Sequence, residues 1–246
     1  METGDEECVR NKIQIVPPDV NRSKNKNRVT KDGIILGYSM ISGVSSFGEI
    51  IERDRIEHGR YADLSDFIKR VHPNDVVFRN LALSGAFDCF GVDRVKVADN
   101  CKRIIQSAKS NSIISALSEN TSKTDIRSII KNEVDSIGFP ITINSDLIDG
   151  LSQNKQISSI SDLTTGHYTI CGAVYALDIY KKIGNGAEYA KVKLYDGTGV
   201  LECRVSSKYY PKLKERIIKG KIVNVSGDYS YDVDRGIYSF WVSDIT

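Results

Sequence analysis

Two short glycine turns in the first half of the chain carry residue types that can bind phosphate through the backbone. The first turn is Ser42-Gly43-Val44-Ser45-Ser46, and the second is Ser84-Gly85-Ala86. Glycine lets the backbone turn with a positive φ and approach a ligand closely. A helix after such a turn presents unpaired N–H groups and the positive end of its dipole. These turns predict two contacts to nucleic-acid backbone, although helix corners packed for stability give the same pattern.

A second group of candidates follows the strict alternation from Tyr189 to Tyr195. One face of this predicted strand is aromatic and basic, and the other is apolar. Rings stack on bases and ammonium groups contact phosphates, so the face suits single-stranded nucleic acid. A solvated sheet face is the alternative interpretation. The predicted binding residues of this half are Lys181, Lys182, Tyr189, Lys191, Lys193 and Arg204, with Tyr229 and Tyr231 near the last hairpin.

The stretch from Asn21 to Lys31 is basic and contains no acidic residue. Its cations are Arg22, Lys24, Lys26, Arg28 and Lys31. Such a run is typical either of a loop that contacts phosphates or of a solvated surface loop.

Catalytic chemistry has little support in the sequence. Asp232 and Asp234 form the one close Asp-x-Asp pair, but it falls in a predicted turn, where Asp is common. A metal-dependent nuclease built on this pair is the weakest of the functions considered. The three histidines stand apart, and no phosphate-binding loop of the Walker type is present. We expect no catalytic residue, metal site, cofactor or small-molecule substrate.

The composition agrees with a folded protein that has local basic surfaces. The chain has 246 residues, a net charge of +2 and 40% hydrophobic residues, which is enough for one large or two small domains. The five cysteines are widely spaced, with no Cys-x-x-Cys motif, as in proteins of a reducing compartment. The acidic start is unlike a signal peptide, and no apolar run reaches membrane-spanning length. We expect a soluble, cytoplasmic protein.

The first half reads as a series of helices after a short strand near Ile13. Pro17-Pro18 makes the next residues extended, and Asp32-Gly33 predicts a hairpin turn. Ser45 and Ser46 are N-cap candidates for a helix that Gly59 ends. Further helices are predicted after Asp63 or Ser65, over 76–83, over 92–117 and over 126–137. The Ser- and Asn-rich stretch 110–124 is the best candidate for a linker.

The pattern changes to strands at Gly166. Strands are predicted over 167–177, 189–195, 200–205, 222–229 and 237–242, with a short helix over 208–217. Three strands, a helix and two strands is the element order of an OB-fold barrel.

Several motifs resemble the C-terminal part of the C-family bacterial replicative DNA polymerases, whose polymerising chain is the DNA polymerase III alpha subunit. They are Glu7 to Ser23, with Pro17-Pro18-Asp19-Val20-Asn21 at its centre, the glycine-led run 37–45, the runs 61–71 and 78–88, Glu133 to Leu147, and Leu194 to Glu202 within the barrel. The chain differs from the family pattern at Ser45, which replaces a hairpin glycine, and at Phe78, which replaces Asn. It also lacks the His-Pro of the family's later element.

The resemblance covers nearly the whole chain and implies two DNA-binding parts. A helix-hairpin-helix module would track duplex DNA behind the primer–template junction, and an OB domain would lie near the single-stranded template. The polymerase palm with its metal-binding aspartates precedes this region in the family and is not in this chain. No clamp-binding peptide of the family type occurs between Ser107 and Ile130.

We therefore predict an α+β protein, with an all-helical helix-hairpin-helix region followed by a C-terminal five-stranded OB-fold β-barrel. The expected parts are an extended segment over 1–33, tandem helix-hairpin-helix motifs over 34–106, a helical linker over 107–164 and the barrel over 165–246. The expected partners are duplex DNA, single-stranded template and a separate palm and fingers polypeptide, with no membrane. Because Met1 immediately precedes the resemblance, the chain is interpreted as a split gene product, an engineered fragment or a degenerate remnant, and the sequence leaves these three alternatives open. A free-standing single-strand-binding or adaptor protein is the alternative.

Overall fold

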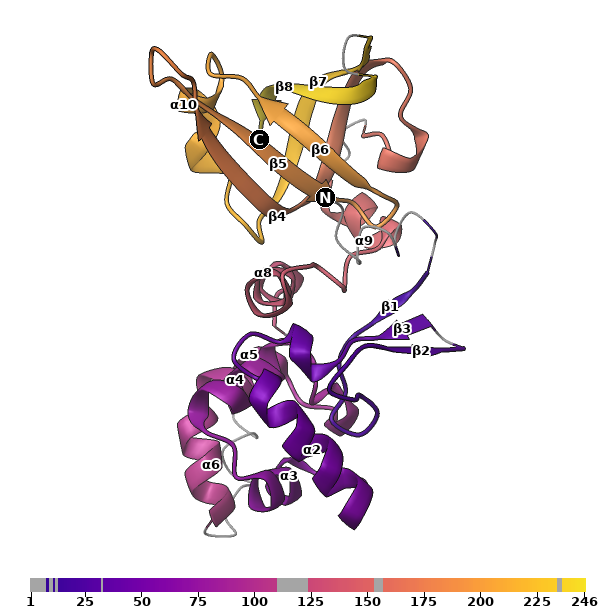
Figure 1. Ribbon diagram of the computed structural model, residues 1–246, viewed down its shortest axis with the longest axis vertical. Helices are drawn as coiled ribbons and strands as arrows, with labels where there is room; N and C mark the ends of the chain where they lie inside the picture. Colours follow the sequence, from indigo (N-terminus) through magenta and orange to yellow (C-terminus); the bar gives the residue numbers. More distant parts are fainter. Residues whose placement is uncertain are drawn as a thin grey trace. The chain divides into compact units, whose positions relative to one another are not determined.

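The computed structural model describes residues 8, 11, 13–31, 33–109, 124–152, 157–233 and 236–246. These residues form two compact units, one of Ile13–Ile137 and one of Gly138–Thr246 together with residues 8 and 11 (Figure 1). Glu7, most of the predicted linker and Asp234 lie outside the described residues. The confirmed fold class is α+β, with a helical region followed by an OB-fold barrel.

The first unit begins with a small three-stranded sheet, and the helices follow it in the chain. Its strands are β1 (Ile15–Val16), β2 (Arg28–Thr30) and β3 (Gly33–Ile35), in the order β1-β3-β2. β2 and β3 are antiparallel, with Thr30 opposite Gly33, as the predicted hairpin turn requires. The 3-10 helix η1 (Tyr38–Met40) then leads into the first glycine turn.

Helices make up the rest of this unit and enclose one hydrophobic core. They are α2 (Ser45–His58), α3 (Leu64–Val71), α4 (Asp75–Leu83), η2 (Asp88–Phe90), α5 (Arg94–Asp99), α6 (Cys101–Lys109) and α8 (Ile126–Ile137). Phe67, Phe78 and Phe87 are almost completely buried at the centre, and Phe87 meets Phe67 edge-on at 5.1 Å and Phe78 in a tilted arrangement at 5.0 Å between ring centroids. Aromatic contacts of this kind add to the stability that apolar burial provides.

The helix boundaries follow local capping chemistry. Gly59 ends α2 with a φ of +81°, and the carboxylate of Asp63 caps α3 by accepting the Asp66 amide at 2.8 Å. The prediction of one helix over 92–117 was wrong in its first part, because the chain breaks at Asn100 into α5 and α6. The side-chain amide of Asn100 donates to the Lys96 carbonyl at 2.9 Å, which satisfies a helix-end acceptor locally.

The second unit is a closed barrel of five strands in the order β4-β5-β6-β8-β7 (Figure 1). The strands are β4 (Gly166–Lys181), β5 (Glu188–Tyr195), β6 (Val200–Val205), β7 (Ile222–Asp232) and β8 (Ile237–Ile245). Helix α10 (Tyr210–Leu213) and η4 (Lys214–Arg216) connect β6 to β7, and α9 (Ser145–Leu151) and η3 (Ile160–Asp162) precede the barrel. The predicted element order is confirmed.

Alternation along β5 places its apolar residues inside the barrel. Ala190, Val192 and Leu194 are at most 1% exposed, whereas the residues between them are partly exposed. Because side chains alternate between the faces of a strand, burial of this apolar set puts Tyr189, Lys191 and Lys193 on the outer surface.

Candidate nucleic-acid interface

The turn before α2 adopts the conformation that its glycine permits. Gly43 has a φ of +70°, which an L side chain rarely adopts. Val44 is fully buried and occupies the N-cap position without a side-chain acceptor. The N-cap role predicted for Ser45 and Ser46 was therefore wrong, because burial of Val44 places both serines within the first turn of the helix.

This turn leaves hydrogen-bond donors exposed. The amides of Gly43, Ser45 and Ser46 have no acceptor among the described residues, and all three residues are exposed. α2 is 14 residues long, so its dipole adds the equivalent of about half a positive charge at this end. Free N–H groups at the positive end of a helix form an anion-binding site, for which a phosphate is well suited.

The turn is held from both sides before any ligand arrives. The amide of Ser42 donates to the carbonyl of Ser136 at the end of α8, at 2.8 Å. The side-chain amide of Asn80 on α4 donates to the carbonyl of Ser42 at 2.7 Å. Because both flanking peptide groups of Ser42 are engaged, little backbone ordering is left for ligand binding to cause.

The second predicted turn has a different environment. Ser84, Gly85 and Ala86 are all buried, and their amides donate at 3.0–3.1 Å to carbonyls in the last turn of α4. In this turn, the amides of Ser84, Gly85 and Ala86 are therefore already engaged and are not free to donate to a phosphate.

Charged side chains explain why the second turn needs glycine. A Cβ on Gly85 would lie 2.7 Å from the guanidinium of Arg94. That guanidinium contacts the completely buried carboxylate of Glu133 at 2.8 Å and Asp88 at 2.6 Å. The following helix, α5, is capped by Asp93, whose Oδ1 accepts the amides of Val95 and Lys96 at 3.0 Å. The residues of this turn are therefore engaged in packing within the helical unit.

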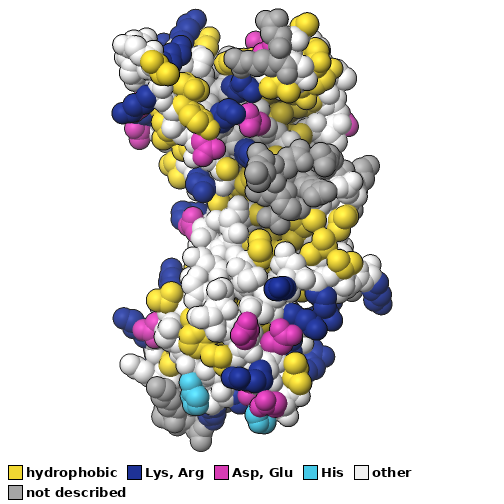
Figure 2. Space-filling model, in the orientation of Figure 1, with side chains coloured by type: hydrophobic (Ala, Val, Ile, Leu, Met, Phe, Trp, Pro, Cys, Tyr) yellow, Lys and Arg dark blue, Asp and Glu magenta, His cyan; other side chains and the backbone are white. Residues whose placement is uncertain are grey.

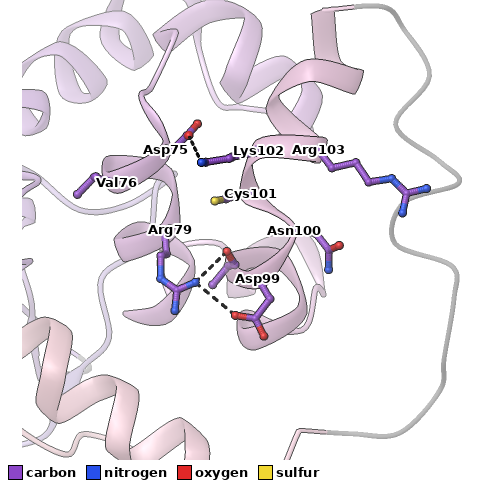
Figure 3. A pocket seen from close by; sticks show the side chains of 9 residues that line it. Asp75, Val76, Arg79, Asp99, Asn100, Cys101, Lys102 and Arg103 are labelled. Atoms are coloured by element: carbon purple, nitrogen blue, oxygen red, sulfur yellow. Dashed lines mark hydrogen bonds and ion pairs between the residues drawn. The ribbon is translucent and has the colours of Figure 1, made fainter.

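A hollow of about 450 Å³ lies between α4 and α6 (Figure 3). Its charged side chains are largely paired with one another: Arg79 contacts Asp99 at 3.3 Å, and Lys102 lies 4.0 Å from Asp75. An anion here would have to displace these carboxylates. The open first turn is therefore the better anion site of this unit.

On the barrel, the outer face of β5 and β6 combines rings with cations. Tyr189 stacks on Tyr180 of β4 with centroids 5.2 Å apart. Lys191 lies 3.3 Å from Glu202, and Arg204 is 3.7 Å from the same carboxylate. The guanidinium of Arg204 also lies 5.9 Å from the ring of Trp241. Sequence reasoning missed Tyr180, Glu202 and Trp241, since only strand pairing brings them to this face.

The remaining predicted residues near this face have more varied environments. Lys193 is opposite Glu202 in the strand register, and Lys181 lies 3.7 Å from Glu188. Lys182 is exposed in the turn that follows β4. Tyr195, at the end of the face, packs its ring 4.8 Å from Phe139, and burial raises the pKa of its phenol. Tyr195 is therefore held by packing at the end of this face.

A tyrosine cluster lies on the β7–β8 hairpin. The rings of Tyr229 and Tyr238 stack with centroids 5.1 Å apart, and Tyr231 meets Tyr238 at 5.0 Å. Tyr231 is 49% exposed and Tyr238 is 54% exposed, so both present ring surface to solvent. Tyr238 was missed in the sequence, where it stands apart from the other two and is joined to them only by cross-strand pairing.

The described residues show no feature that favours a catalytic or membrane-spanning function. Asp232 ends β7, and its predicted metal partner Asp234 lies outside the described residues. Among the described residues, no group of three or more His, Cys, Asp and Glu side chains could hold a metal ion. No described helix combines the length and apolar content that a membrane crossing requires.

The fold and these surfaces define the class of protein. Residues 12–97 match the helix-hairpin-helix motif family, and residues 168–246 match the OB-fold nucleic acid binding domain family. The chain therefore joins a helix-hairpin-helix region to an OB-fold nucleic acid binding domain.

The chain as a whole resembles the C-terminal part of the DNA polymerase III alpha subunit, as its motifs predicted. It is 29% identical to DNA polymerase III subunit alpha of Aquifex aeolicus, over 95% of this chain and 21% of that protein. Identity to the subunit of Haemophilus influenzae is 25%, over 92% of this chain and 22% of that protein. The chain thus spans about a fifth of the length of these relatives.

Part of the chain also aligns with a solved mitochondrial single-stranded DNA binding protein from S. cerevisiae, Rim1. The alignment has a TM-score of 0.28 and 18% identity, and it covers 34% of this chain and 95% of that one.

Proposed function

We propose that this chain is a non-catalytic DNA-binding region of a C-family replicative DNA polymerase. The helical unit holds the backbone of duplex DNA, and the barrel contacts single-stranded template. One observation carries the proposal: the glycine turn at the start of α2 exposes the free amides of Gly43, Ser45 and Ser46 within a region that matches the helix-hairpin-helix family. Catalysis would come from the palm and fingers of such a polymerase, because this chain spans about a fifth of the length of the alpha subunit that it resembles.

The binding preference tests this proposal directly. Fluorescence anisotropy compares labelled duplex, single-stranded and primed-template DNA over a series of salt concentrations. We expect micromolar or tighter binding with a preference for duplex or junction DNA, and an affinity that falls steeply with salt because phosphate contacts release counterions. Absence of binding to any of the three DNAs would contradict the proposal for the isolated chain.

A substitution at the helix start separates binding from folding. Ser46→Glu places a carboxylate at the positive end of α2, which favours the helix but repels a phosphate. We expect an unchanged or slightly higher melting temperature and a duplex affinity about 5- to 10-fold lower, equivalent to about 1 kcal/mol. Ser46→Gln has nearly the same shape without the charge and should keep the duplex affinity.

A second function, a free-standing single-strand-binding or adaptor protein, is favoured by the exposed rings of Tyr231, Tyr238 and Trp241. Such rings can stack on bases of any sequence. Binding to single strands alone, with Ser46→Glu having no effect, would favour this second function. Co-purification with a palm-containing polypeptide would favour the polymerase.

A further inference from the structure

The basic segment, residues 21–31, is fixed along α2 by hydrogen bonds from that helix. The guanidinium of Arg55 donates to the carbonyls of Val20 at 2.6 Å and Ser23 at 2.5 Å. The carboxylate of Glu52 accepts the amide of Asn25 at 2.8 Å. The path of the first half of the segment is therefore set by the same helix whose start carries the free amides.

Further bonds tie the basic segment to the residues just before the first turn. The amides of Tyr38 and Ser39 donate to the carbonyls of Lys24 and Asn25 at 3.1 and 3.0 Å. The amide of Gly37 donates to the side chain of Asn27 at 2.8 Å. These bonds hold residues 24–27 against Gly37 and η1, which ends two residues before Ser42.

Two glycines allow this close approach. A Cβ on Gly48, in the first turn of α2, would lie 2.1 Å from Oδ1 of Asn25. A Cβ on Gly37 would lie 2.4 Å from the backbone of Lys26. The contact at Gly37 is with the backbone of the segment, so that position requires glycine for the segment to lie where it does, whereas a Cβ on Gly48 would force the side chain of Asn25 to move.

Three cations of the segment remain available on this backbone. Lys26, Arg28 and Lys31 are exposed, and no ion pair joins them to a carboxylate of the described residues. Lys24 differs, because it lies 3.9 Å from Glu52. Lys and Arg side chains gather over β2 and the segment that leads to it (Figure 2).

We propose that Lys26, Arg28 and Lys31 make a second contact to DNA backbone, on the same duplex that the glycine turn at the start of α2 binds. This inference rests on the proposed function. Duplex DNA carries one charge per about 1.7 Å of its length, so a basic surface fixed beside a phosphate-binding turn meets further phosphates of the same duplex. The segment supplies the second contact that the buried second turn, with its occupied amides, does not.

The test removes the three cations together. Lys26→Ala, Arg28→Ala and Lys31→Ala in one chain should reduce the slope of log affinity against log salt for duplex DNA by about 2 to 3, at about 0.9 per lost phosphate contact. The melting temperature should not change, because none of the three side chains makes an ion pair with a described carboxylate. The matched control replaces three other exposed cations of the same unit by Ala, namely Arg60, Arg103 and Arg127. It should leave the salt slope for duplex DNA close to that of the unaltered chain.

The outcomes separate this inference from the proposed function. If Ser46→Glu weakens duplex binding but the triple variant keeps the full salt slope, the inference is overturned and the proposed function stands. An equal loss of slope in the control would also overturn it, because net charge alone would then explain the effect. So would a loss seen on single strands but not on duplex. If the unaltered chain binds no duplex, the proposed function fails first.

Discussion

The side-chain amide of Asn80 on α4 donates a 2.7 Å hydrogen bond to the carbonyl oxygen of Ser42, at the entrance to the turn that carries the free amides. The same peptide region is held from α8 through the amide of Ser42. Two helices distant in sequence therefore set the direction of the donors at the start of α2.

Asn80→Ala should loosen this turn. Loss of one hydrogen bond costs about 1 kcal/mol of unfolding free energy, and we expect duplex affinity to fall about threefold or more as the amides become less ordered. Urea unfolding and anisotropy with duplex DNA measure the two effects. Asn80→Asp cannot donate to the carbonyl and should have a larger effect, so full duplex affinity in both variants would rule out the positioning role.

On the barrel, Glu202 competes for the cations of the β5–β6 face. Glu202→Gln removes the carboxylate that lies near Lys191 and Arg204. We expect tighter binding of single-stranded DNA at low salt, because the freed cations can contact phosphates. Anisotropy with a labelled single strand measures this change, and weaker binding in Glu202→Gln would contradict it.

Replacing Lys191 and Lys193 together by Ala should have the opposite effect. Two lost contacts at about 0.7 each predict a salt slope for single-stranded DNA smaller by roughly 1–2. The double substitution of Lys212 and Lys219, two exposed cations outside this face, serves as the control. An unchanged slope would remove the face from the binding surface.

The tyrosine cluster should contribute through stacking. Tyr231→Ala or Tyr238→Ala should weaken single-stranded DNA binding by about 1–3 kcal/mol if each ring stacks on one base. Tyr→Phe at the same positions keeps the ring and should keep most of the affinity. Equal losses in the Phe and Ala variants would point to the hydroxyl groups and contradict stacking.

The buried pair of Arg94 and Glu133 should matter for stability. Glu133→Ala leaves the largely buried guanidinium with only Asp88 as a partner, and loss of one side of a buried pair typically costs about 3–5 kcal/mol. Chemical denaturation should show this loss. At temperatures where the variant is still folded, duplex affinity should be retained, since the second turn has no free amide. Duplex binding lost from a fully folded variant would assign the second turn a role in the interface.

Acid should weaken the contact between α2 and α3. Burial alone would raise the pKa of Asp54, but Tyr61 and Arg70 stabilise its carboxylate and hold its pKa below the ordinary value. A carboxyl with a lowered folded-state pKa contributes stability above its unfolded pKa, near pH 4, and this contribution is lost as the pH falls through the folded value. Thermal melts between pH 6 and 2 should show a smaller decline in Asp54→Asn than in the unaltered chain. Parallel declines would exclude Asp54 as a cause.

Local sequence determined much of the fold. The positive φ at Gly43 and the end of α2 at Gly59 depend on the glycines themselves, so both could be predicted, and Asp63 is one of the two caps that the sequence offered for α3. The alternation along 189–195 likewise separates the inside of the barrel from its surface, because one face of a strand is either apolar or not. The order of strands and helix then predicted the OB-fold, and the motifs predicted the resemblance to the polymerase.

Only the tertiary structure decided which predicted binding residues are accessible. The two glycine turns look alike in sequence, but the amides of the second are occupied by carbonyls of α4 and its residues are buried, while Asn80 holds the exposed first turn from a distant helix. On the barrel, strand pairing brings Glu202 to the cations and Tyr238 to the other tyrosines. These outcomes depend on contacts between residues far apart in the chain, and no local periodicity encodes which distant side chain will be the neighbour.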